Sequence, residues 1–315
     1  MNNSIDRTAT PEARISLLNS LGTSGIGENR DLFKHEIEFQ RIITNSNTSI
    51  FRPLQLSCDT LTEFPNLQVA YIIDAFDLLP TRPDLAFDSM WKALEAGIHD
   101  DNNTNDPNMV VELNKLADTL PTETSQLLWK STPGLAKVKL MRRIMEPKAE
   151  APTGSWDNGK LFTWQKDPKR KALISDIQKE LTRMEQELST KAISKTEIRR
   201  QLGMFLANTM LQGKLSTPTA DKPIPGNLSS VILLLFLYGM RNDRTHANST
   251  PAFLKQNAVL RDYAYHYYCV VAVYAILMTV RATKLNGPNL TSGNVRKNAA
   301  ENLRIAEALF GDAWQ

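Results

Sequence analysis

The sequence predicts a mainly α fold, on three observations. Apolar residues recur at helical spacing along most of the 315 residues. Helix-start signals precede several of these stretches. Glycine, proline and small polar residues gather in a few linkers. With 42% hydrophobic and 23% charged residues, the composition is that of an ordinary globular protein.

The elements follow from these signals in order. Pro83 stands at a helix-opening position, and Ser194 with Glu197 fits the capping-box pattern. Residues 49–58 could pair as short strands, whereas 100–108 and 217–226 are polar linkers by composition. The expected helices cover residues 32–43, 67–79, 85–98, one or two within 109–146, 168–189, 195–212, 228–240, 251–284 and 294–310.

Charge divides the chain into an acidic first part and a basic remainder. Residues 1–130 hold 10 Lys and Arg against 19 Asp and Glu, and residues 131–315 hold 27 against 15. Such a division can steer a polyanion to one face, although charges that cluster in sequence can also be spread over a helical surface. We expect an acidic N-terminal section (1–64) and a helical bundle (65–99 and 227–315) that encloses a basic, mostly helical insertion (100–226).

The first ten residues are polar, so we expect no secretory signal, and the longest apolar runs, 231–237 and 270–280, are too short to span a bilayer. Cys58 and Cys269 have no metal or redox spacing, and the four histidines form no zinc pattern. We therefore expect a reduced cytoplasmic protein that has no cofactor and no membrane contact.

The segment Arg241-Asn242-Asp243-Arg244-Thr245-His246 is polar throughout and lies between two apolar helices. A His near neutral pKa can take the proton of a ribose 2′-hydroxyl or give one to the leaving 5′-oxygen. An Arg can hold the scissile phosphate. Arg241 and His246 are therefore candidate catalytic residues for RNA cleavage without a metal. Asn242 would position the phosphate or the His, and Arg244 would add phosphate contacts.

Helix geometry limits how Arg241 and His246 can meet. Five residues of an unbroken helix turn through about 500°, which leaves the two side chains roughly 140° apart. Asn242 and His246, four residues apart, would share a face. Either a turn at Asn242-Asp243 folds Arg241 back, or two copies of the segment meet across a two-fold axis.

The Arg-x4-His spacing alone is weak, because it also occurs at Arg30–His35 and Arg261–His266. The first of these pairs begins an amphipathic helix, and the second lies in a long apolar helix where His266 is expected to be a core residue. The polar residues between Arg241 and His246 distinguish this segment from the other two. The alternative is that the segment is only a helix-capping turn.

The segment resembles the motif of the HEPN superfamily, helical bundles with Arg-x(4–6)-His in which Asn, Asp or His often follows the Arg. The preceding Leu237-Tyr238-Gly239-Met240 fits as well, and residues 87–95 look like the second helix of such a bundle. The resemblance implies a homodimeric ribonuclease, a toxin or an anti-phage effector, in which Glu95 could orient Arg241; a surface helix glutamate is the equal alternative for Glu95. One branch of the superfamily pairs with a nucleotidyltransferase antitoxin and has Tyr two residues after the His. This chain has Asn248 at that position, which argues against that pairing.

The insertion also contains a candidate RNA-contacting stretch. Aromatic side chains can stack on unpaired bases while cations neutralise phosphates. Equally, the aromatic residues could anchor a linker to the core. The candidate RNA-binding residues are Lys160, Trp164, Lys166, Lys169, Arg170 and Lys171.

The leading interpretation is thus a homodimeric, metal-independent endoribonuclease. The alternatives are a non-catalytic helical module that binds RNA or protein, and a subunit of a larger defence complex. An antitoxin or another protein of a defence complex is a further candidate partner.

Overall fold

The computed structural model describes residues 32–46, 50–102, 109–145, 168–217, 221–224, 228–245, 258–285 and 287–315. These residues are predominantly helical, so the mainly α fold is confirmed.

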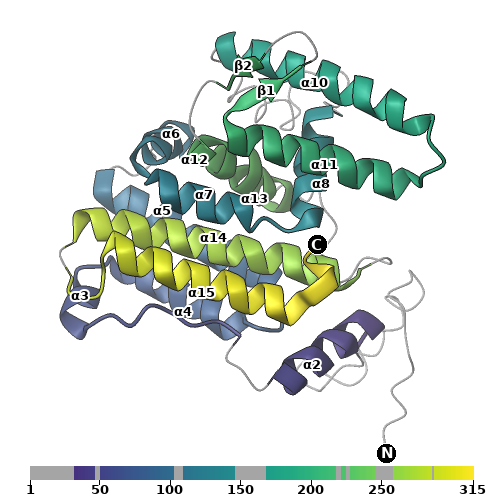
Figure 1. Cartoon of the computed structure of the whole chain (residues 1–315). Coiled ribbons are helices and arrows are strands. Elements are labelled where there is room, and N and C mark those ends of the chain that lie inside the picture. Colours follow the sequence, from purple (N-terminus) through teal and green to yellow (C-terminus); the bar gives the residue numbers. More distant parts are fainter. Residues whose placement is uncertain are drawn as a thin grey trace, which may run out of the picture.

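Four long helices form one layer of the molecule. They are α4 (Asn66–Leu78), α5 (Pro83–Asn102), α14 (Leu260–Lys284) and α15 (Ser292–Phe310). α4 packs on α5, α5 on α14 and α14 on α15 (Figure 1). α14 is the central helix, because its side chains are buried on every face over most of its length. α2 (Lys34–Ser46) covers one end of this layer, where Phe39 contacts Tyr263 and Phe310.

The remaining helices stack above this layer in Figure 1. α6 (Met109–Thr119) and α7 (Thr122–Lys130) pack on α12 (Leu228–Ser230). α8 (Gly134–Met145), α10 (Pro168–Ser189) and α11 (Lys195–Gln212) pack on one another at the far end. The helices of section 100–226 share one continuous hydrophobic core with the flanking bundle.

Local signals explain the sharpest helix ends. Ser194 caps α11 by accepting a hydrogen bond from the Glu197 amide, as the capping pattern predicts. Gly213 ends the same helix with φ of 67°, a left-handed conformation that favours glycine. Pro168 is the first residue of α10, where a missing amide hydrogen costs nothing.

Three local predictions were wrong. The linker expected at 100–108 is helical at its start, because α5 continues to Asn102. The 217–226 region is not wholly a linker, because Asp221–Pro223 (β2) pairs antiparallel with Lys214–Ser216 (β1). The described residues 50–58 contain no strand. Their chain begins as an extended segment and then enters α3 (Cys58–Thr62).

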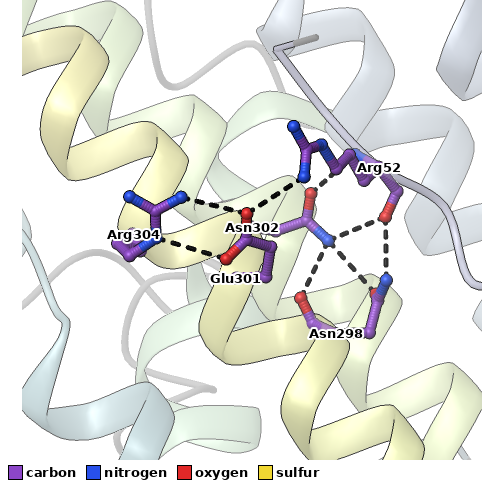
Figure 2. A network of polar contacts seen from close by, with 5 residues as sticks. All are labelled: Arg52, Asn298, Glu301, Asn302 and Arg304. Carbon is purple, nitrogen blue, oxygen red and sulfur yellow. Dashed lines mark hydrogen bonds and ion pairs between the residues drawn. The ribbon is translucent and has the colours of Figure 1, made fainter. Parts of the chain in front are cut away.

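Side chains, rather than a neighbouring strand, hold this extended segment. The fully buried Asn302 of α15 accepts a hydrogen bond from the Arg52 amide at 2.8 Å and donates one to the Arg52 carbonyl at 2.9 Å (Figure 2). Asn298 donates to the same carbonyl. The hydroxyls of Tyr274 and Tyr267 bond to the Leu54 amide and the Ile50 carbonyl. These contacts satisfy the backbone groups that a strand partner would otherwise take.

α14 passes the length and composition test for a membrane span, with a mean hydropathy of 1.4 over its most apolar window. However, 94% of that window is buried inside the protein, as in the core helix of a globular domain. The apolar run is therefore longer than the sequence analysis allowed, and its apolar side chains pack against the rest of the chain.

Candidate functional site

The helix that carries the polar segment runs without a break through Asn242 and Asp243. It starts as α12, continues as the π-helical segment η1 (Val231–Leu237) and ends as α13 (Tyr238–Thr245). The alternative prediction of a turn at Asn242-Asp243 is therefore wrong. Wide π turns are rare, and they are often found next to functional residues.

Arg241 lies on the face of α13 that is turned toward α5. Its Nη2 atom is 3.1 Å from Oε1 of Glu95, and its Nη1 donates a hydrogen bond of 3.1 Å to Oδ1 of Asn242. The indole nitrogen of Trp91 donates to the same Oε1 atom at 2.8 Å, which fixes the Glu95 carboxylate. The Arg241 side chain keeps 29% of its surface exposed, so it is oriented by its partners and partly accessible.

Asn242 is placed differently from Arg241, because only 4% of its surface is exposed. A side chain so deeply buried cannot reach a phosphate in solution. Its contact with Arg241 instead suits a positioning role.

Arg244 is committed to carboxylates of α5. Its Nε and Nη2 donate to the two carboxylate oxygens of Asp88, at 2.8 and 2.6 Å, and Nη2 lies 3.5 Å from Asp84. The Arg244 side chain is only 14% exposed. The phosphate contact expected for Arg244 does not fit this environment, so we correct it: Arg244 holds α13 against α5.

The acidic partners on α5 share one helix face. Asp84, Asp88, Trp91 and Glu95 follow one another at steps of four, three and four residues, which keeps them on one side of a helix. The sequence analysis identified Glu95 but missed Asp84 and Asp88. The i, i+4 spacing of these two carboxylates on the helix already singled out was the signal that could have revealed them.

Asp84 is the most buried carboxylate of this group, at 1% exposure. Both of its oxygens accept hydrogen bonds of 3.0 Å from Arg82. Burial alone would raise the pKa of Asp84. The hydrogen bonds and the charge of Arg82, together with the charge of Arg244, outweigh burial and hold the pKa below its usual value.

Several predicted site residues lie outside the described residues. They include His246, Lys160, Trp164 and Lys166. Lys169, Arg170 and Lys171 fall at the start of α10, but their side chains also lie outside the described part. Elsewhere in the described insertion, basic side chains often pair with acidic neighbours, as Arg183 does with Glu180 and Arg200 with Glu197.

The other described Arg-x4-His histidines are buried. His35 is 5% exposed and stacks on Phe33. His266 is 4% exposed, as expected for a core residue, and its Nδ1 donates to the Asp262 carbonyl at 2.6 Å. Burial and the nearby charge of Lys139 lower the pKa of His266 to about 3, which keeps the ring neutral. Neither histidine lies at an accessible surface.

Within the described ranges, no group of three or more His, Cys, Asp or Glu side chains is arranged to hold a metal ion. No protein-family model matches the chain, and comparisons with curated proteins and with solved structures find no match. The site must therefore be interpreted from its own geometry.

Proposed function

We propose that the protein is a metal-independent endoribonuclease of HEPN type that acts as a homodimer. One observation carries the proposal: Glu95 and Asn242 hold the partly exposed side chain of Arg241, five residues before His246 in the sequence. An oriented guanidinium that is partly exposed can stabilise the charge that develops on a phosphate during ester cleavage. The resemblance of the motif to HEPN proteins adds a toxin or anti-phage role.

In the proposed mechanism His246 removes the proton of the ribose 2′-hydroxyl, and the resulting oxygen attacks the adjacent phosphorus. The bond to the 5′-oxygen breaks, and that oxygen receives a proton from a histidine. Arg241 stabilises the charge that develops on the phosphate oxygens. The products are a 2′,3′-cyclic phosphate and a 5′-hydroxyl.

Helix geometry supports a dimeric site. With α13 helical through Thr245, Arg241 and a helical residue 246 in one chain would lie roughly 140° apart around the axis. A two-fold contact between α13 segments would instead place two arginines and two histidines in one cleft. The proposal therefore assigns the complete site to two chains.

The first test is RNA cleavage in the presence of EDTA. We expect wild-type protein to produce 2′,3′-cyclic phosphate ends, and Arg241→Ala and His246→Ala variants to produce none. Arg261→Ala, in the exposed first turn of α14, and His99→Ala, a half-buried histidine on α5, are matched controls that should retain cleavage. RNA binding without cleavage, unchanged by His246→Ala, would instead support a non-catalytic RNA-binding module.

The second test asks whether the site is shared. Arg241→Ala and His246→Ala chains are mixed after unfolding and refolding together, and cleavage is compared with that of each variant alone. A shared cleft should regain activity, because one chain supplies the Arg and the other the His. A strictly monomeric mass in solution, or active wild-type protein without any rescue, would contradict the two-chain site.

A further inference from the structure

The segment from Pro53 to Thr81, which contains α3 and α4, has an unusual charge pattern. It contains no Lys, Arg or His, but it has four acidic residues: Asp59, Glu63, Asp74 and Asp77. All four are exposed. None of them forms an ion pair with another described residue.

Some acidic residues elsewhere in the described chain differ in this respect. Asp88, Glu197 and Glu301, for example, each pair with an arginine. The carboxylates of α3 and α4 are thus uncompensated within the described part of the protein. Their negative potential extends into solvent over roughly a Debye length, about 8 Å at physiological salt.

The same surface exposes large apolar side chains. Leu67 is 57% exposed, Ile73 53% and Leu61 39%. Around the axis of α4, Leu67, Ala70 and Ile73 lie within an arc of about 120° that also contains Asp74 and Asp77. Leu67 and Ile73, exposed on one helix face with acidic neighbours, form an apolar strip that a partner protein could cover.

The opposite face of α4 completes the hydrophobic core. Ile72 and Ala75 are buried, and Phe76 contacts Phe51 and Tyr274. The exposed arc is therefore not required for the packing of α4. Lys92 of α5 bounds the surface on one side, where its ammonium lies 5.7 Å from the Tyr71 ring centroid.

Charge restricts what can bind to this surface. Nucleic acid and anionic membranes would be repelled by the four carboxylates. A second copy of the chain in a two-fold contact would place these carboxylates against the same set, and like charges facing each other oppose association. The surface therefore differs from the α13 contact in the proposed ribonuclease dimer.

We infer that the outer face of α3 and α4 is a docking surface for a basic amphipathic helix of a partner protein. The apolar side chains of that helix would pack against Leu67, Ala70 and Ile73. Leu67 and Ile73 are separated by about 9 Å along the α4 axis, which matches an i, i+3/i+4, i+7 pattern on the partner. Its lysines or arginines would pair with the carboxylates at both ends of this apolar strip.

A model peptide tests the inference on the full-length protein. The probe is a fluorescein-labelled helical peptide of about 18 residues, or five turns, with leucines on one face and lysines beside them. A second peptide has glutamate in place of every lysine. We expect fluorescence anisotropy to show binding of the basic peptide only, weakening as sodium chloride is raised.

Matched variants locate the binding. Asp74→Lys with Asp77→Lys, and separately Leu67→Ser with Ile73→Ser, should each weaken basic-peptide binding by about tenfold or more. Glu123→Lys with Glu185→Lys makes the same charge change on α7 and α10, away from α3 and α4 in Figure 1, and should leave binding nearly unchanged. Circular dichroism verifies that each variant is folded.

Hydrogen–deuterium exchange gives an independent readout, because bound peptide should slow exchange within residues 58–78. The inference is overturned if the basic peptide does not bind, if both peptides bind equally, or if the Glu123/Glu185 variant loses as much affinity as the α4 variants. None of these outcomes depends on ribonuclease activity.

Discussion

Replacing Arg244 with alanine tests whether ion pairs hold α13 against α5. The substitution removes both hydrogen bonds to Asp88 and the nearby charge at Asp84. Removing one partner of a buried ion pair costs about 3–5 kcal/mol. Because the Asp88 side chain is 33% exposed and Asp84 keeps Arg82, we expect a smaller loss, about 2–3 kcal/mol.

The assay is urea unfolding followed by far-ultraviolet circular dichroism. Arg244→Ala, Asp88→Ala and the double variant form a thermodynamic cycle, in which we expect a coupling free energy of about 1–2 kcal/mol. Arg304→Ala removes a pair with Glu301 from an arginine that is 69% exposed, and it should cost less than about 1 kcal/mol.

Two results would refute this account of α13. One is a coupling free energy between Arg244 and Asp88 below about 0.5 kcal/mol, because substitutions at independent sites are additive to within that value. The other is an Arg244→Ala variant as stable as wild type. Either would mean that apolar packing of η1 and α13 is sufficient to place Arg241.

Three further predictions concern the packing of the layer formed by α4, α5, α14 and α15. Asn302→Ala should lower the free energy of unfolding by about 2–3 kcal/mol and make residues 50–57 more sensitive to protease, because the Arg52 amide loses its acceptor and the Arg52 carbonyl loses one of its two donors, keeping Asn298; equal protease sensitivity would contradict this. Gly97→Ala should cost about 1–3 kcal/mol in urea unfolding, because the new Cβ would lie 2.2 Å from Nε2 of Gln68; unchanged stability would show that Gln68 moves aside easily. The pKa of His266 is lowered from 6.5 to about 3, so the unfolded chain binds the extra proton between these values. The free energy of unfolding should therefore fall as the pH drops from 6.5 toward 3, less steeply in His266→Gln, and a His266 NMR signal that titrates near pH 6.5 would contradict the burial argument.

Sequence signals predicted the regular helices best where capping chemistry marked their ends. The expected helices 168–189 and 195–212 coincide with α10 and α11, because Pro168 and Ser194 define their first turns. The segment before α3 was harder to predict. Its composition suits a strand, but composition cannot reveal that Asn302, 250 residues away, supplies the hydrogen bonds.

The candidate site was predictable only in part. The polar filling of 241–246 and the adjacent α5 sequence indicated Arg241 and Glu95, and these two side chains do form an ion pair. The ion pairs of Arg244 were not predictable from the segment itself, since an arginine in a polar stretch can face solvent or an acidic helix. Its environment depends on the rotation of α13 relative to α5, which no local pattern specifies.

That rotation depends on η1. Each residue added to or removed from the helix upstream of Arg241 turns the following side chains by about 100° relative to the preceding ones. If Val231–Leu237 formed an α-helix of the same length, Arg241 and Arg244 would rotate together away from Glu95 and Asp88, because a π-helix turns less at each residue than an α-helix. The π-helical geometry of this apolar stretch, and not only its hydrophobicity, therefore determines which way Arg241 and Arg244 point.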